Sequence, residues 1–305
     1  ELLCKPRRPE PSPPENVTQA VATSELVLEP SEYIRQVIED ISANKLDLRG
    51  SPWIVPASPF NEATKINKKR ERSGEPLLNA DEVLHLVTKP LLFIWAPEKL
   101  LPGLRIYCPT CSSVASGTRW AQPRLLHDTN GQYQYLATRH LCSVCSATTS
   151  STRKRSEKTF MSDSKEAIRT LPANVAHLWD VTDTGKRLCR NSVVDLVRAM
   201  ATRTSWSAIA EAINEMKMTE WVKSTTIVYL QLCESLGIQP SSVPSAMPEA
   251  WRISHKWVRR LFVTDANERR GAICQELAAE KGGDMLALDW TKDAATRAGK
   301  PFLFN

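Results

Sequence analysis

Two pairs of cysteines carry the most specific chemistry in this 305-residue sequence. Cys108 and Cys111 are separated by two residues, and Cys142 and Cys145 repeat that spacing. Two such pairs can bring four thiolates to the corners of a tetrahedron, the geometry that Zn²⁺ prefers in a structural site. Two disulfides or four unligated thiols are the alternatives, but disulfides need an oxidising compartment and the sequence shows no secretory signal. The spacing therefore predicts a structural Zn²⁺ ion bound by all four cysteines, with no position open for water.

The segment between the two cysteine pairs is expected to fold as a β-hairpin. Residues 124–127 and 132–138 are strand-like, and Asn130-Gly131 between them is a strong turn signal. Such a hairpin returns the second cysteine pair to the first. His127 and His140 lie near the cysteines in the sequence. They are either alternative ligands, partners of the ligands, or ordinary hairpin histidines.

Basic residues that can contact phosphates gather in three places. A run within residues 65–72 also fits a nuclear localisation signal or a solvated surface loop, and a second run follows the cysteine domain. The third is a stripe along an expected helix beside tryptophans, which fits either a nucleic-acid contact or a solvated face. The net charge of +6 permits a nucleic-acid partner without requiring one. The candidate phosphate contacts are Lys68, Lys69, Arg70, Arg153, Lys154, Arg155, Arg252, Lys256, Arg259 and Arg260.

Asp289 ends an apolar, strand-like run, and this position has two interpretations. Rigid strand ends can hold carboxylates that bind two Mg²⁺ ions about 4 Å apart and so catalyse phosphoryl transfer. An aspartate in an ordinary turn or helix cap fits the same pattern. Asp293 is the only acidic residue after Asp289, and a single carboxylate cannot hold two Mg²⁺ ions.

The helices and strands expected around these residues indicate an α+β chain that is mainly helical. A Pro-rich tail, a short helix after Ser31 and a basic loop occupy residues 1–80. A small, β-rich, zinc-ribbon-like Cys4 domain is expected at residues 81–160, with a strand at 91–95. A helical domain follows at residues 161–283, and residues 284–305 begin another strand-rich element.

Within the helical domain, the apolar periodicity separates several helices. The first is expected to be capped by Ser192, and the lengths of the first three fit a helix-turn-helix unit or another small bundle. Asp265 with Glu268 resembles a capping box that starts a fifth helix, which Gly282-Gly283 would close. The first four helices are expected at residues 192–200, 205–215, 219–236 and 248–262.

Together these motifs resemble eukaryotic proteins related to DDE transposases, in which an uncharacterised Cys4 zinc domain precedes the catalytic core. The similarity covers about residues 90–305, and the cysteine pattern is its most specific part. The similar segments are residues 93–98, 102–111, 124–128, 135–145, 188–234 and Asp289-Trp290-Thr291-Lys292.

The resemblance implies a zinc domain, a helical region and the first hairpin of an RNase H-like core that is incomplete in this chain. Asp289 would be the first acidic residue of the DDE triad, and Mg²⁺ would bind only where the full core exists. Because the other two acids are missing, the chain as given is not expected to cut or join DNA. It is expected to be either a piece of a longer transposase-like protein or a domesticated relic.

The sequence therefore predicts a zinc-containing, nucleic-acid-binding protein of intracellular, nuclear location that is derived from a DDE-transposase-like protein. The alternative is a domesticated, non-catalytic scaffold that docks onto a protein or ribonucleoprotein assembly, which the nine tryptophans suit because aromatic residues anchor protein interfaces. No membrane partner is expected, because no apolar stretch approaches the ~20 residues of a membrane span. The sequence does not indicate an oligomeric state.

Overall fold

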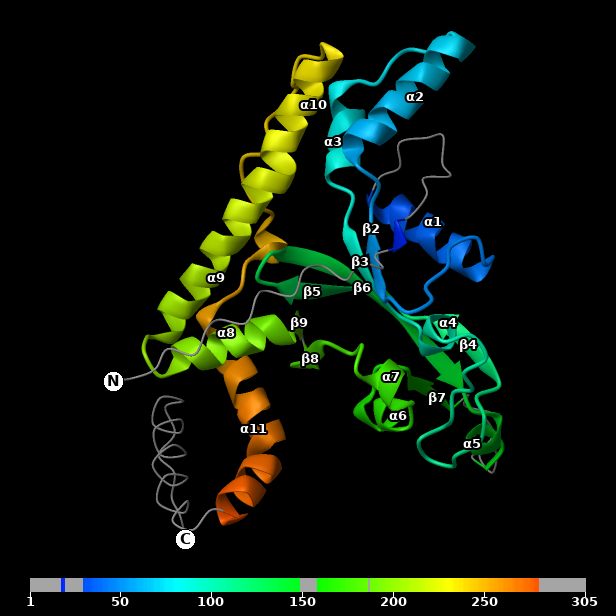
Figure 1. Ribbon diagram of the computed structural model, residues 1–305, viewed down its shortest axis with the longest axis vertical. Coiled ribbons are helices and arrows are strands. Elements are labelled where there is room, and N and C mark those ends of the chain that lie inside the picture. Colours follow the sequence, from blue (N-terminus) through cyan, green and yellow to red (C-terminus); the bar gives the residue numbers. More distant parts are fainter. Residues whose placement is uncertain (1–17, 20–29, 149–157, 186, 280–305) are drawn as a thin grey trace. The chain divides into compact units, whose positions relative to one another are not determined.

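The computed structural model describes residues 18–19, 30–148, 158–185 and 187–279, and the chain divides into two compact units (Figure 1). Unit 1 contains residues 1–126, 132–179 and 223–245, and unit 2 contains residues 127–131, 180–222 and 246–305. Each unit combines helices with strands, so the predicted α+β class is confirmed. Among the described residues, no helix has both the length and the apolar character needed to cross a membrane.

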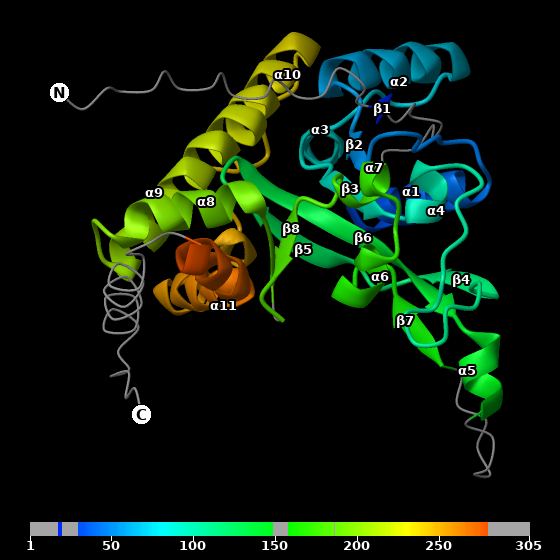
Figure 2. The ribbon, with the colours of Figure 1, turned by 60° about the horizontal axis from the view of Figure 1, so that its bottom comes forward.

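The sheet of unit 1 is mixed and is built around the apolar strand predicted at residues 91–95. This strand, β3 (Leu91–Trp95), is buried and runs parallel to β6 (Gly131–Leu141), with Phe93 opposite Tyr135 (Figure 2). β2 (Trp53–Val55) pairs in antiparallel register with the other edge of β3. On its far side β2 pairs in parallel with β1 (Thr18–Gln19). Since β3 has neighbours on both sides, its continuous apolar run is the pattern expected of a central strand.

The predicted hairpin is confirmed. β5 (Arg124–Asp128) and β6 are neighbours in the sheet and are joined at Thr129–Asn130, beside Gly131. β6 is long enough to serve two sheets, because its last residues pair antiparallel with β4 (Gly117–Trp120) and with β7 (Thr159–Met161). We call this three-stranded arrangement of β4, β6 and β7 the small sheet. β6 therefore connects the main sheet of unit 1 to the region of the cysteines.

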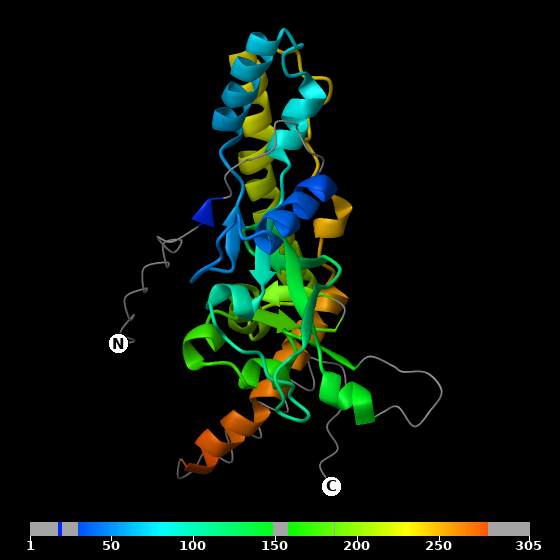
Figure 3. The same cartoon turned by 90° about the vertical axis from the view of Figure 1, so that its right-hand side faces the viewer.

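Helices cover unit 1 and include one element that was predicted wrongly. The expected basic loop within residues 65–72 is part of helix α2 (Pro59–Ser73), which has proline in its first turn and ends at Gly74 in the left-handed conformation. Ala63 and Ile66 of α2 pack with α3 (Ala80–Val87) and α10 (Val228–Leu236) in one core (Figure 3). A single buried stripe is enough to fix a helix whose other face is charged. The remaining helices are α1 (Pro30–Ser42), α4 (Pro97–Leu100), α5 (Ser143–Thr148), α6 (Lys165–Arg169) and α7 (Ala173–Ala176).

Unit 2 packs three helices around an apolar core. Helices α8 (Asn191–Ala201), α9 (Trp206–Trp221) and α11 (His255–Ala279) contribute Val197, Ile213 and Val258 to this core, among others. A hairpin-like pair of strands, β8 (Val181–Asp183) and β9 (Leu188–Arg190), precedes α8. These strands lie in a stretch that was predicted to be mostly helical.

Several predicted helix boundaries are wrong. The described residues are helical without a break from Trp206 to Leu236, through α9, the π-helical Val222–Ile227 and α10, so the turn between the expected second and third helices is not formed. No glycine or proline interrupts this stretch, so it contains no residue that would stop the helix. Pro248 precedes only a short 3₁₀ turn, Glu249–Trp251, before α11 begins.

Two residues that were predicted to start helices form ion pairs or hydrogen bonds within unit 2 instead. Asp265 lies inside α11, where its carboxylate accepts hydrogen bonds from the Arg198 guanidinium, with Nε 2.6 Å from Oδ2. The Ser192 hydroxyl donates to Asp128 over 2.8 Å and does not cap α8. In both cases a tertiary partner outcompetes the local cap. The expected closing glycines and the strand-like run around Asp289 lie outside the described residues.

Candidate metal centre

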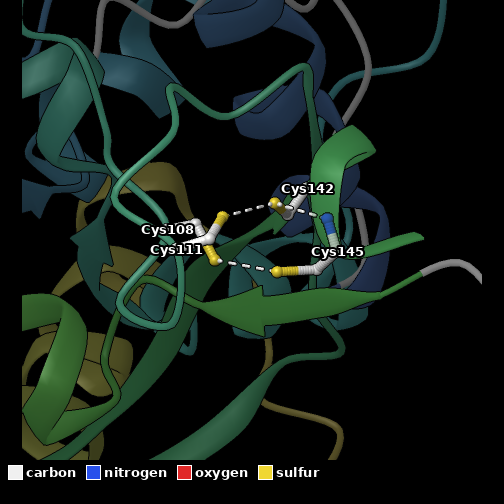
Figure 4. A group of neighbouring side chains, drawn as sticks. All are labelled: Cys108, Cys111, Cys142 and Cys145. Atoms are coloured by element: carbon white, nitrogen blue, oxygen red, sulfur yellow. Dashed lines mark hydrogen bonds between the residues drawn. The ribbon is translucent and has the colours of Figure 1, made fainter. Parts of the chain in front are cut away.

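Four cysteine sulfur atoms meet in unit 1, as their spacing predicted (Figure 4). The Sγ atoms of Cys108, Cys111, Cys142 and Cys145 all lie within 4.8 Å of one another. Cys108 and Cys145 are 3.8 Å apart, and Cys111 and Cys142 are 3.4 Å apart. A tetrahedron with Zn–S bonds of about 2.3 Å requires sulfur atoms about 3.8 Å apart. The cluster therefore has the dimensions of a four-thiolate site that could hold a metal ion such as zinc.

The first pair is presented by a tight β-turn-like loop. Tyr107 and Val114 bridge across its base, and the backbone N–H of Cys108 donates to the Ser113 carbonyl over 2.8 Å. The N–H of Ser112 donates back to the Cys108 carbonyl over 2.8 Å, and Ser112 takes a positive φ of 57° to close the loop. This conformation turns the chain sharply enough to aim both cysteines at one point.

The second pair is presented differently from the first. Cys142 directly follows β6, and Cys145 lies in the first turn of α5. The backbone N–H of Cys145 points at the Cys142 sulfur over 3.4 Å, and the Ser146 hydroxyl donates to the Cys142 carbonyl over 2.7 Å. The first N–H groups of a helix have no partner within the helix, so here one of them stabilises a thiolate.

The electrostatics of the cluster favour a cation at its centre. The Ser113 hydroxyl lies 3.3 Å from the Cys142 sulfur, and this contact, with the Cys145 N–H, lowers the pKa of Cys142 to about 6. The crowding of Cys145 by the Cys111 and Cys142 sulfurs raises the pKa of Cys145 to about 12. Four negative charges cannot accumulate at such short range by themselves. A divalent cation removes this conflict, because it stabilises all the thiolates together.

Neither histidine near the cysteines belongs to the four-sulfur cluster in the described part of the chain. His140, on β6, is buried and lies 3.1 Å from the Thr118 hydroxyl and 3.7 Å from the Glu98 carboxylate. Burial lowers the pKa of His140 to about 4 and raises the pKa of Glu98. His140 is therefore neutral at physiological pH and acts as a packed core residue. His127 belongs to unit 2.

The predicted basic residues of α2 divide into two groups. Arg70 is not available as a phosphate contact, because its guanidinium makes a bidentate pair with Glu82, with distances of 2.6 and 3.0 Å. Lys68 and Lys69 are exposed. Two further exposed cations, Lys65 and Arg72, share the same helical face at intervals of three and four residues. The helical period would have identified them if the segment had been recognised as a helix.

The predicted basic stripe beside tryptophans lies in unit 2 at the start of α11. Lys256 and Arg260 are exposed, one turn apart, while Arg259 is half-buried. Arg252 is exposed in extended backbone before the helix and pairs with Glu249 over 3.4 Å. Trp257, Val258 and Leu261 are buried in the core, as expected for the opposite face. Arg153, Lys154, Arg155 and Asp289 lie outside the described residues.

A buried lysine is the main titratable feature that was not predicted. Lys217 of α9 is fully buried in unit 2, where its Nζ lies 2.9 Å from His127 Nδ1 and donates to the Trp251 carbonyl over 3.1 Å. Burial lowers the pKa of Lys217 to about 7 and that of His127 to about 2. The sequence carried one signal of this burial. A spacing of four residues places Lys217 on the same helical face as Ile213 and Trp221, and this face is buried.

Charged neighbours surround this buried amine. The Asp128 carboxylate accepts from Arg190 over 2.9 Å, and Arg190 also binds Asp180 over 2.8 Å. Asp128 raises the pKa of Lys217, whereas Arg187 lowers it. Burial raises the pKa of the neighbouring Cys189 thiol, so this cysteine is not an activated nucleophile. The cluster is a buried polar network in which His127 Nε2 is left without a hydrogen-bond partner.

Comparison with known proteins gives one kind of match. A protein-family model matches residues 83–267, and its description is a domain of unknown function, DUF6729. No curated protein and no solved structure matches the chain. The matched range contains both cysteine pairs, the buried Lys217 and the basic start of α11, but it excludes α2 and Asp289. These comparisons do not link the chain to DDE transposases, so that origin stays a prediction.

The four-sulfur cluster predicts one tightly bound zinc ion per chain. Replacing the exposed Cys111 with serine removes one ligand without disturbing a packed side chain, so we expect Cys111→Ser to lose zinc during dialysis against a mild chelator. The measurement is zinc content by mass spectrometry of the purified chain. Cys233→Ala is the matched control, because Cys233 is a buried cysteine of the same unit outside the cluster. Equal zinc content in Cys111→Ser and wild type would contradict the assignment.

The buried lysine predicts a pH-dependent stability. Between pH 7 and 10 the unfolded chain carries a proton on Lys217 that the folded chain has lost, so this residue makes stability rise with pH across that window. Lys217→Met removes this contribution. The quantity to compare is the free energy of urea unfolding of Lys217→Met minus that of wild type. We expect this difference to be higher at pH 6.5 than at pH 10 by about 2–4 kcal/mol. A difference between the two proteins that is independent of pH would show that Lys217 does not titrate as described.

Proposed function

We propose that this chain, which belongs to the DUF6729 family, is a zinc-containing protein that binds nucleic acid and is not catalytic by itself. The observation that carries the proposal is the cluster of four cysteine sulfurs within 4.8 Å. The exposed basic helical faces support the nucleic-acid part. A nuclear location and an origin from a DDE-transposase-like protein are parts of the same proposal that rest on the sequence motifs alone.

A structural role for zinc follows from the number of ligands. Four protein thiolates fill the tetrahedral coordination of Zn²⁺, so no position is left for a substrate or an activated water. In this role the ion fixes the turn that carries Cys108 and Cys111 against the junction of β6 and α5. The residues around the centre, including Ser113, then orient and stabilise thiolates and take no part in a reaction.

Nucleic-acid binding is supported by the placement of exposed cations on regular helices. On α2 the set Lys65, Lys68, Lys69 and Arg72 occupies one face, and on α11 Lys256 and Arg260 do the same. A helix holds such side chains at fixed intervals, so several can neutralise phosphates of one backbone at the same time. These contacts would be independent of nucleotide sequence, because they go to the phosphates.

A catalytic function has no support among the described residues. The four cysteines are the only group of metal-binding side chains found there, and no set of carboxylates accompanies them. Mg²⁺ would have a role only where Asp289 is completed by the other acids of an RNase H-like core. We therefore propose no reaction for this chain.

An alternative proposal is a non-catalytic scaffold that docks onto a protein or ribonucleoprotein assembly. It is favoured by apolar side chains exposed around the metal centre: Tyr107 is 41% exposed, Val114 is 44% exposed, and Val144 is 51% exposed. Tyr107 and Val114 bridge the base of the first cysteine turn, and Val144 lies between the second two cysteines. An exposed apolar group on a rigid support is typical of a protein interface.

Salt-dependent binding separates the two proposals. We expect the zinc-loaded chain to bind a labelled random DNA duplex at low ionic strength, with an affinity that falls steeply as salt is added. Measured by fluorescence anisotropy, Lys256→Gln with Arg260→Gln should reduce the log–log slope by about two, one for each lost phosphate contact. Arg203→Gln, an exposed arginine of the same unit away from the stripe, should leave it unchanged. Absence of binding at low salt would favour the scaffold.

A further inference from the structure

The four cysteines of the candidate metal centre differ in their access to solvent. Cys111 is exposed and Cys145 is half-buried, whereas Cys108 and Cys142 are buried. A small reagent in solution therefore reaches Cys111 before it reaches the other three. Among thiols, those that are accessible and have thiolate character are the ones that oxidants attack. Cys111 is thus the place at which an oxidant can enter the cluster.

The short sulfur contacts of the cluster run between the two cysteine pairs. The Cys111 sulfur lies 3.4 Å from the Cys142 sulfur, and the Cys108 sulfur lies 3.8 Å from the Cys145 sulfur (Figure 4). A cysteine that an oxidant has converted to a sulfenic acid condenses with a neighbouring thiol to form a disulfide. Cys142 is placed as that neighbour for Cys111.

A disulfide between Cys111 and Cys142 would join the same elements that a metal ion joins. Cys111 belongs to the tight first turn, and Cys142 lies between β6 and α5. The turn would therefore stay attached to the end of β6 after the ion has left. Since a disulfide is reduced again by attack of a thiolate, the four thiols can be restored from this state.

Backbone hydrogen bonds hold the surroundings of the cluster independently of the sulfur atoms. The N–H of Ser116, just before β4, donates to the Leu141 carbonyl over 2.9 Å. The N–H of Cys142 donates to the Lys158 carbonyl, just before β7, over 2.9 Å. The small sheet therefore keeps Cys142 in place when the ligands of the ion change. Oxidation can then be a local event at the cluster.

We propose that the metal centre is an oxidation-sensitive site, in which a peroxide converts Cys111 and Cys142 to a disulfide and releases the zinc ion. The inference rests on the zinc part of the proposed function and adds a modification site to it. Where thiols are otherwise kept reduced, a disulfide of this kind is transient and is typical of redox sensing. The structural ion thereby becomes the element that responds to the oxidant.

The oxidation takes place in two steps. The Cys111 thiolate attacks one oxygen of hydrogen peroxide, the O–O bond breaks, and Cys111 becomes a sulfenic acid while the other oxygen leaves as hydroxide. The Cys142 thiolate then attacks the Cys111 sulfur, so the S–S bond forms and a second hydroxide leaves. The two sulfurs have lost two electrons to the peroxide, and each hydroxide takes a proton from solvent to become water. Zn²⁺ keeps only two thiolate ligands, too few for a closed structural site, and dissociates.

The test follows zinc and disulfides together in the zinc-loaded full chain. Hydrogen peroxide is added in an amount equal to the protein, released zinc is measured with a chromogenic chelator, and the cysteines are alkylated and mapped by mass spectrometry. We expect the amount of zinc released to equal the yield of the Cys111–Cys142 disulfide. A thiol reductant with added zinc should then restore the original zinc content. Cys233→Ala is the matched control, because this buried cysteine lies outside the cluster, and it should behave as wild type.

Ser113 provides a variant that keeps all four ligands. Its hydroxyl lies 3.0 Å from the Cys111 sulfur and 3.3 Å from the Cys142 sulfur, so it can donate a hydrogen bond to either thiolate. Such a bond stabilises a thiolate and makes it less nucleophilic. We expect Ser113→Ala to bind zinc and to release it to peroxide roughly two- to tenfold faster than wild type, as one lost hydrogen bond implies.

Three results would overturn the inference while the zinc centre of the proposed function stands. The first is zinc that stays bound after peroxide treatment, and the second is a first disulfide between any other two cysteines. The third is release that is no faster in Ser113→Ala than in Cys233→Ala, which would contradict attack at the two sulfurs beside the hydroxyl. A purified chain that binds no zinc before oxidation would overturn the zinc part of the proposed function, and this inference with it.

Discussion

The close approach of four cysteine sulfurs is the constraint on which the part of unit 1 around the candidate metal centre depends. Sulfur atoms within 4.8 Å of one another cannot all be thiolates unless a cation lies among them. The same atoms come from a tight turn, from the end of β6 and from the first turn of α5, so a bound ion fixes these three elements at once. β6 then transmits this anchoring to the main sheet through its pairing with β3.

Unit 2 is held by a different combination of interactions. An apolar core joins α8, α9 and α11. Within unit 2 the amine of Lys217 also contacts His127 Nδ1 and donates a hydrogen bond to the backbone carbonyl of Trp251. Burying an amine destabilises a fold unless its hydrogen bonds are satisfied, and these two contacts together with nearby Asp128 offset that penalty. The opposite surface of α11 is left free to carry exposed cations. α11 therefore packs one face against the core and exposes its charged face.

The sequence predicted local features well wherever short-range signals decide them. The cysteine spacing, the Asn130-Gly131 hairpin and the apolar strand β3 each have a strong local signature, and each is formed. Features decided by tertiary contacts were missed. The basic run of α2 became a helix because Ile66 found a core, and the continuation of α9 depends on the absence of a stop signal. The cross-strand pairing of Arg119 with Arg139 requires the register, which one sequence does not reveal.

Zinc K-edge X-ray absorption of the full chain tests the central claim most directly, because it reports the ligands of the ion itself. The account predicts four sulfur neighbours at about 2.3 Å and no nitrogen or oxygen neighbour. A first shell that contains nitrogen or oxygen at about 2.0 Å would contradict a centre built from Cys108, Cys111, Cys142 and Cys145 alone.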